Sequence, residues 1–336
     1  MKYYWKIGVQ GRDILGKKRF CKWQSKLKYF LNFRKYYYDG KVNESLRKRK
    51  EVVFFIDGRT THGGLSDRLR GLFSVYYYCR KRSYDFKVCW TYPFKLQDYF
   101  VPATFDWVVT PEQINHNRRE VAFRFFNSYS FMNNDEKSYF ELLDSEKPIL
   151  HVYSNVTLHE ELFKDMFSEL FKPAQALEHA VSQCLRKLNG GGKYVSITFR
   201  FIGILGDFKD KDKSYGELTD EKKKVYIKKC LSVCEKLHNE HNGMLLVTSD
   251  SPVFLAEVQK LDFVYVIPGK VVHMDNVSND NYQLHLKSFL DMMMISKAEK
   301  CYSYCYGRMF RDSKFARTSA LIGGRPFEDI IEEEEN

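Results

Sequence analysis

Residues 51–71 read EVVFFIDGRTTHGGLSDRLRG. The continuous apolar, β-branched and aromatic run Val52–Ile56 is typical of a buried parallel strand. Gly63 and Gly64 then form a turn, and the apolar residues that follow recur on one face of a helix that extends to about Arg82. A strand, a glycine turn and a helix in this order predict a βα unit of an open α/β sheet.

The second half of the chain alternates in the same way. Its predicted strands are 194–199, 244–248, 263–267 and 300–303, and its predicted helices are 219–238, 252–260, 282–297 and one that starts near Ser313. This order predicts a doubly wound parallel sheet. In the first half, further strands are predicted at 86–90, 107–110 and 148–153.

Two domains are expected because 336 residues exceed the length over which a single core usually grows. A helix predicted over 173–188 ends in Asn189 and three glycines, which mark a break. We therefore predict a basic arm over 1–50, an N-terminal Rossmann-like domain over 51–189 and a C-terminal Rossmann-like domain over 190–327. Residues 328–336 are acidic and are predicted to be a disordered tail.

The first 50 residues carry much of the positive charge. They contain 16 of the 54 Lys and Arg residues but only 3 of the 43 Asp and Glu residues, and aromatic residues are interleaved with the basic ones. This composition favours contact with an anionic membrane surface. A flexible arm without a partner is the main alternative, and binding of nucleic acid is not expected.

The sequence has no run of about 18 apolar residues and no N-terminal signal-peptide pattern. These features favour a cytoplasmic protein, with peripheral attachment at the inner membrane face as an option. The eight cysteines are then expected to be reduced thiols. Cys230 with Cys234 and Cys301 with Cys305 could be metal ligands, but the spacing is not that of a zinc site and buried hydrophobic thiols are favoured.

Polar residues follow the predicted strands of the second half. Arg200 follows the strand 194–199, Asp250 follows the strand that starts at 244, and Ser313 opens the last helix. The carboxyl ends of parallel strands bind ligands, and helix N-termini and arginine bind phosphate. Each residue also has an ordinary structural interpretation, a surface ion pair for Arg200 and helix capping for the other two. Their common position at one sheet edge favours a site for a phosphorylated ligand.

Three stretches carry a resemblance to a known family: GGLSDRLRG at 63–71, SITFR at 196–200 with GDF at 206–208, and SKFART at 313–318. Together they resemble the fucosyltransferase superfamily, which includes bacterial α-1,2- and α-1,6-fucosyltransferases, over about residues 51–325. The resemblance implies a GT-B-like α/β fold in which two Rossmann-like domains have parallel sheets that face each other across a cleft. It implies an acceptor-side N-terminal domain and a C-terminal domain that binds the nucleotide sugar.

The resemblance also implies roles for single residues. Arg200 takes the place of the arginine that binds the donor diphosphate, Asp67 stands beside the transferred sugar, and Asp250 lies near the nucleoside. The other implied donor-binding residues are Gly63, Gly64, Asp207, Ser313, Lys314 and Phe315. Two positions depart from the family pattern, because Thr198 replaces a histidine and Phe201 replaces a second arginine, and residues 202–205 are an insertion relative to that pattern.

The implied mechanism is one displacement at the anomeric carbon, without a metal ion or another cofactor. Arg200 would stabilise the charge on the leaving diphosphate, and a base would take the proton of the acceptor hydroxyl. The candidate bases are, in order, Asp67 and His62, then Asp57 and Asp207. Residues 210–212 spell the D-x-D motif of metal-dependent glycosyltransferases, but a solvated turn is favoured because they lie in a charged loop.

The predicted function is therefore that of a metal-independent inverting glycosyltransferase that transfers fucose from GDP-fucose to a polysaccharide or lipid-linked oligosaccharide. The expected partners are the nucleotide sugar, the saccharide acceptor and an anionic membrane surface at residues 1–50. The alternatives are a glycosyltransferase with another nucleotide sugar and a non-catalytic protein that binds carbohydrate or nucleic acid.

Overall fold

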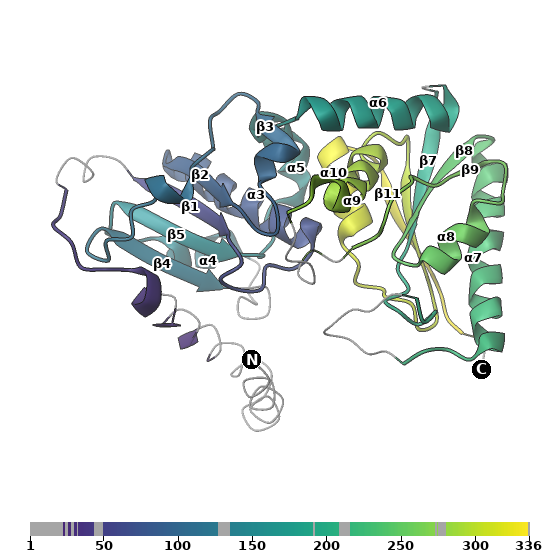
Figure 1. Cartoon of the computed structure of the whole chain (residues 1–336), viewed down its shortest axis with the longest axis horizontal. Helices are drawn as coiled ribbons and strands as arrows, with labels where there is room; N and C mark the ends of the chain where they lie inside the picture. Colours follow the sequence, from purple (N-terminus) through teal and green to yellow (C-terminus); the bar gives the residue numbers. More distant parts are fainter. Residues whose placement is uncertain are drawn as a thin grey trace. The chain divides into compact units, whose positions relative to one another are not determined.

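The computed structural model describes residues 23, 26, 27, 30, 31, 33–43, 50–126, 135–190, 192–207, 216–272, 274 and 280–334. The chain divides into two compact units (Figure 1). Unit 1 comprises the residues up to Gly63 with Asp67–Tyr92 and Pro102–Glu160, and unit 2 comprises Gly64–Ser66, Pro93–Val101 and the residues from Glu161 onward. Each unit contains its own parallel sheet, and each is described here by itself.

The sheet of unit 1 has four parallel strands in the order β2-β1-β5-β4. They are β1 (Glu51–Ile56), β2 (Asp85–Trp90), β4 (Val121–Phe126) and β5 (Ile149–Ser154). Helices α3 (Leu65–Arg82) and α4 (Glu136–Leu143) cover one face through aromatic contacts such as Tyr76 with Phe86 and Tyr139 with Phe126. Because β1 continues to β2 on one side and pairs with β5 on the other, the strand order reverses between β1 and β5.

The sheet of unit 2 has five parallel strands in the order β11-β10-β7-β8-β9 (Figure 1). They are β7 (Tyr194–Phe199), β8 (Met244–Ser249), β9 (Val264–Tyr265), β10 (Cys301–Tyr306) and β11 (Phe327–Glu332). Alternate residues of β7 point to opposite faces, which are covered by different helices. Val195, Ile197 and Phe199 share a core with α7 (Asp220–His241) and α8 (Pro252–Val258).

The opposite face of this sheet meets α9 (Tyr282–Ile295), since the Tyr194 hydroxyl donates to the Met294 carbonyl at 2.5 Å. Helices α6 (Gln175–Asn189) and α10 (Phe315–Gly323) pack on α9. The sheet is therefore covered by helices on both faces, as predicted for a doubly wound fold. Shorter elements complete the description: 3-10 helices Leu96–Asp98, Pro111–Gln113 and Glu160–Leu162, strands β3 (Phe100–Pro102) and β6 (Phe171–Pro173), and helix α5 (Phe163–Leu170).

The predicted α/β fold class is confirmed, and β7 has the predicted bounds. Two local predictions are wrong, and one strand was not predicted. Residues 107–110 form no strand and contribute only a bridge between Val88 and Val108, and β4 was not predicted. The acidic tail is also not disordered over its first residues, because β11 pairs in parallel with β10. Its acidic side chains meet basic ones from neighbouring elements, among them Lys300 with Glu328 and Arg311 with Glu333.

The predicted break after residue 189 is the end of α6. Gly190 has φ 57°, and its N–H donates to the Arg186 carbonyl at 3.0 Å, which is a glycine C-cap. The compact units divide elsewhere, at Glu160 and Glu161, because α6 packs on α9 of unit 2. The helix before the glycines therefore belongs with the sheet that follows them.

Part of the predicted basic arm is packed on unit 1. Tyr37 is buried, and its hydroxyl lies 2.5 Å from Nδ1 of His151 on β5. Residues 33–43 are thus not a free arm, whereas most of 1–32, 44–49 and the whole D-x-D sequence 210–212 lie outside the described residues. Within the described part of the chain, no helix is both long enough and apolar enough to cross a bilayer.

Candidate functional site

The carboxyl ends of β7 and β10 are the first candidate site. The strand order of unit 2 reverses between these two neighbours, because β7 continues to β8 on one side and pairs with β10 on the other. Ligands of open α/β sheets bind outside the carboxyl ends of the strands at such a reversal. The loop after β7 and the loop that leads from β10 to α10 both lie there.

Arg200 is the first residue after β7 and lies at this edge. Its side chain is 24% exposed, and Nη1 lies 3.2 Å from Oδ2 of Asp250, which follows β8. The carbonyl of Arg200 accepts a hydrogen bond from the N–H of Phe310 in the loop after β10, at 2.9 Å. The predicted diphosphate-binding arginine is therefore tied to both neighbouring loops.

Asp250 does not have the surroundings predicted for a nucleoside-binding residue. Its side chain is 1% exposed, and its carboxylate accepts the N–H groups of Phe201 and Ile202, each at 2.7 Å. Burial raises the pKa of this carboxyl group, while Arg200 and the two N–H groups oppose the rise. These contacts give Asp250 an internal role in holding the loop after β7.

The two departures from the family pattern have structural reasons. Thr198 lies opposite Thr248 on β8, and their buried hydroxyl oxygens are 2.7 Å apart. Phe201 is fully buried and packs on Phe254 of α8 with ring centroids 5.1 Å apart. Both positions therefore serve the interior of unit 2.

Asp207 links the loop after β7 to the start of α8. Its Oδ2 accepts the Ser251 hydroxyl at 2.5 Å and the Val253 N–H at 2.8 Å. Its Oδ1 is buried and has no hydrogen-bond partner among the residues that the structure describes. Helix capping is thus an established part of its role, and donor binding by this residue stays a prediction.

The start of α10 does not agree with the ordinary structural interpretation of Ser313 as a helix cap. Lys314 is the N-cap residue, has φ −99°, and makes no side-chain capping hydrogen bond. Phe315 is the first helical residue and is half-buried, whereas Lys314 is exposed. The first turn therefore keeps N–H groups that no N-cap side chain satisfies, which is the feature that makes a helix N-terminus suitable for an anion.

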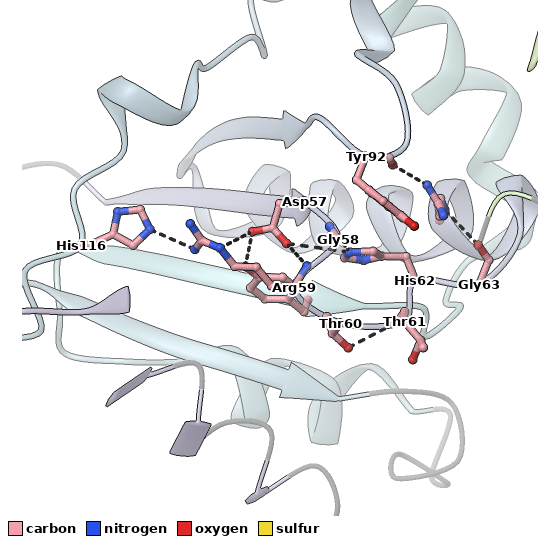
Figure 2. A network of polar contacts seen from close by, with 11 residues as sticks. Asp57, Gly58, Arg59, Thr60, Thr61, His62, Gly63, Tyr92 and His116 are labelled. Atoms are coloured by element: carbon pink, nitrogen blue, oxygen red, sulfur yellow. Dashed lines mark hydrogen bonds and ion pairs between the residues drawn. The ribbon is translucent and has the colours of Figure 1, made fainter. Parts of the chain in front are cut away.

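The second candidate site is a polar network at the carboxyl ends of β1 and β5 in unit 1 (Figure 2). Asp57 directly follows β1 and accepts the Tyr153 hydroxyl at 2.6 Å and the Arg59 N–H at 3.0 Å. Figure 2 shows the Arg59 guanidinium between Asp57 and His116, at 3.2 Å and 3.3 Å. The Tyr36 ring stacks on the same guanidinium, and its centroid lies 3.9 Å from Cζ of Arg59.

His62 belongs to this network in a way that the sequence did not predict. Its Nε2 accepts the Gly58 N–H at 3.0 Å and lies 3.9 Å from Asp57, and its side chain is only 3% exposed (Figure 2). The acceptor nitrogen is therefore already used inside the loop. In this conformation His62 positions the loop after β1 and is a poorer candidate for a base than predicted.

The glycine turn before α3 agrees with the prediction at one of its two positions. Gly63 has φ 78°, and a Cβ atom there would lie 2.7 Å from Oδ2 of Asp67, so glycine is required. At Gly64, by contrast, nothing lies within 4 Å of where a Cβ atom would be, so a side chain would fit there. Asp67 lies in the first turn of α3, has a 39% exposed side chain, and is 3.7 Å from Arg70.

Sequence reasoning missed three residues of unit 1. Arg68 is fully buried and donates to the carbonyls of Gly63 at 2.9 Å and Tyr92 at 2.7 Å, so it braces the glycine turn. Arg59 and Tyr153 complete the network around Asp57. The position of Arg59, two residues after the carboxylate at the end of a strand, could have indicated that it pairs with Asp57. Nothing in the sequence indicated that Arg68 is buried.

No group of three or more potential metal ligands occurs among the described residues. The paired cysteines of unit 2 are free and buried, and burial raises the pKa of each thiol; they are Cys230, Cys234, Cys301 and Cys305. They pack as small hydrophobic side chains.

Comparisons with known proteins give no match to a family model and none to a curated protein sequence. Solved structures do match. A mutant of Arabidopsis thaliana FUT1 in complex with GDP is 13% identical, with a TM-score of 0.54 over 98% of this chain and 79% of that chain. The NodZ alpha-1,6-fucosyltransferase soaked with GDP-fucose is 13% identical, with a TM-score of 0.50 over 82% and 92%.

The selenomethionine form of fucosyltransferase NodZ from Bradyrhizobium has the same identity, coverage and TM-score as the soaked form. At this identity the likeness concerns the fold. The chain therefore shares the α/β fold of these solved fucosyltransferase structures.

Proposed function

We propose that the protein is a glycosyltransferase that transfers fucose from GDP-fucose to a saccharide acceptor, with inversion and without a metal ion. The observation that carries the proposal is Arg200, an accessible guanidinium at the strand-order reversal of unit 2, tied to the loop that leads to an N-terminus without a side-chain cap. Solved structures with this fold are described as complexes with GDP or GDP-fucose, which supports the same donor here.

In the proposed reaction, unit 2 stabilises the negative charge that develops on the leaving diphosphate. In the proposed reaction the acceptor oxygen bonds to the anomeric carbon of fucose while the bond from that carbon to the diphosphate oxygen breaks, so negative charge grows on GDP. Arg200, Lys314 and the first N–H groups of α10 supply positive charge at the edge where the diphosphate is proposed to bind. One such preorganised donor contributes about 3 kcal/mol to a transition state of this kind.

The proton of the acceptor hydroxyl must go to a base. Of the two first-ranked candidates, Asp67 has a partly exposed side chain, whereas His62 is buried and its Nε2 accepts the Gly58 N–H. We therefore assign the role to Asp67. Asp57 has both oxygens in contact with Tyr153 and Arg59, and is assigned to holding Arg59 in place.

A lipid-linked acceptor would bring the protein to a membrane surface, and the basic and aromatic composition of residues 1–50 supports this part of the proposal. Sedimentation with vesicles that contain anionic lipid tests it. Binding that disappears on deletion of residues 1–32 is expected, and equal binding by neutral vesicles would contradict it.

Calorimetric titration with GDP, GDP-fucose, UDP and dTDP tests the donor, and product release from GDP-fucose in EDTA tests the reaction. Arg200→Ala is expected to weaken GDP binding at least ten-fold, in line with the loss of a charge-assisted bidentate contact. Arg325→Ala is the matched control, because Arg325 is exposed and precedes β11 at the opposite edge of the same sheet. Equal GDP affinity of the two variants would remove the support for the site.

A further inference from the structure

Two carboxylates join the loops after β7 and β8, and each loop supplies one carboxylate that accepts hydrogen bonds from the other loop. Asp250, from the loop after β8, accepts the N–H groups of Phe201 and Ile202 in the loop after β7. Asp207, from the loop after β7, accepts the Ser251 hydroxyl and the Val253 N–H at the start of α8. The backbone that carries Arg200 is therefore held by specific acceptors rather than by strand pairing alone.

The loop after β7 is strained at one position. Ile202 has φ 51°, a left-handed conformation that β-branched residues rarely adopt, and its side chain is buried. Such a conformation persists only where the surroundings hold it. The Ile202 N–H donates to Oδ2 of Asp250 at 2.7 Å, and Nη1 of Arg200 lies 3.2 Å from the same oxygen. One oxygen atom thus contacts both the strained residue and the guanidinium.

The two members of the ion pair differ in exposure. The Asp250 side chain is 1% exposed and the Arg200 side chain is 24% exposed, so a ligand at this edge can reach the cation and not the carboxylate. Burying an ionised carboxylate is costly unless its oxygens are bonded, and here two N–H groups and the guanidinium meet them. Because this carboxylate is costly to bury and a ligand cannot reach it, its role is best explained by the groups that it binds, which are the Phe201 and Ile202 N–H groups and the Arg200 guanidinium.

We propose that Asp250 is the positioning residue of this site: its buried carboxylate fixes the strained turn at Ile202 and directs the Arg200 guanidinium toward the diphosphate. The inference rests on the proposed function for the identity of the ligand. It departs from a direct role of Asp250 at the nucleoside, because Asp250 acts on ligand binding only through Arg200.

A double-mutant cycle with GDP as the probe tests the action through Arg200. Asp250→Asn keeps the shape of the side chain and removes its charge, and we expect it to weaken GDP binding about ten-fold in the wild-type background. In the Arg200→Ala background the same change should alter GDP binding less than two-fold. Equal losses in both backgrounds, or no loss in the first, would overturn the proposal, because Asp250 would then act on the ligand or on the fold in general.

Asp291→Asn is the matched control, since Asp291 is another buried carboxylate of unit 2 and is bonded to Lys287 at 2.9 Å on α9. It should leave GDP affinity within two-fold of wild type. Amide hydrogen exchange without any nucleotide supplies a second measurement. Protection of the Phe201 and Ile202 amides should fall at least ten-fold in Asp250→Asn and should be unchanged in Asp291→Asn.

The two measurements separate this inference from the proposed function. If the wild-type protein binds no GDP, the proposed function fails, and the exchange comparison alone decides the role of Asp250. Unchanged protection of both amides in Asp250→Asn overturns the inference even if GDP binds well. If Asp250→Asn does not fold, Asp250→Glu replaces it, because a longer carboxylate keeps the charge and displaces the oxygen that meets both Ile202 and Arg200.

Discussion

Replacing Gly71 by alanine should destabilise unit 1, because α3 approaches the end of β5 so closely there that a side chain has no room. A Cβ atom on Gly71 would lie 2.0 Å from the Ser154 carbonyl oxygen, 2.7 Å from its carbon and 2.9 Å from the Cα of Asn155. Ordinary van der Waals contact begins near 3.4 Å, so the helix and the strand end must separate by more than an ångström. All three atoms are backbone, and no flexible side chain can move aside.

Overpacking of this kind costs about 3 kcal/mol, and the better helix propensity of alanine returns about 1 kcal/mol. The net loss of about 2 kcal/mol corresponds to a fall in Tm of about 4–8 °C for a unit of this size. The assay is thermal unfolding followed by circular dichroism. Gly64→Ala is the matched control, because nothing lies within 4 Å of a Cβ atom there, and its Tm should stay close to that of wild type. A Gly71→Ala protein as stable as wild type would refute the packing argument.

Three further predictions concern the two sites. Burial lowers the pKa of His151 and of His116 below the usual value for histidine. Below about pH 6.5 the unfolded chain therefore takes up protons that the native protein does not. As the pH falls, the free energy of unfolding should decrease by up to about 1.4 kcal/mol per pH unit for each histidine. Urea unfolding of wild type and His151→Gln between pH 7.5 and 5 measures this, and an unchanged pH slope in the variant would contradict it. Tyr153→Phe removes the hydroxyl that donates to Oδ2 of Asp57. It should cost about 1–3 kcal/mol in the same assay, since a buried carboxylate oxygen loses one of its two partners and keeps only the Arg59 guanidinium; a neutral effect would speak against the network. Phe201→Arg introduces the second arginine of the fucosyltransferase pattern that the sequence resembles, at a fully buried position. It should lower the stability of unit 2 by about 3 kcal/mol or more without improving GDP affinity, and tighter GDP binding would show that the position can face the ligand.

The strands and helices of unit 2 could be predicted because their sequence signals are local. β7 and β8 are continuous apolar runs, and α8 begins with Pro252 behind a serine N-cap. β11 could not be predicted in this way, because its sequence FEDIIE is acidic and its stability comes from pairing with β10 and from basic side chains of other elements. β4 was missed because it lies among aromatic segments whose patterns do not separate strand from loop.

The candidate site was predicted only as far as strand ends reveal it. A residue that directly follows a parallel strand lies at the ligand-binding edge whatever its contacts, which is why Arg200 was found. The burial of Asp250 depends on the left-handed turn at Ile202, and the orientation of His62 depends on the Gly58 N–H. These are properties of loop conformation, and no periodicity or propensity in the sequence encodes them.

The central claim is that a nucleoside diphosphate binds where the strand order of unit 2 reverses. A crystal structure of the protein soaked with GDP tests it most directly. We expect the diphosphate oxygens within hydrogen-bonding distance of the Arg200 guanidinium and of the first N–H groups of α10, with Asp250 still bonded to Phe201 and Ile202. GDP bound elsewhere, or a soaked crystal with no GDP at this edge while calorimetry detects binding, would contradict the account.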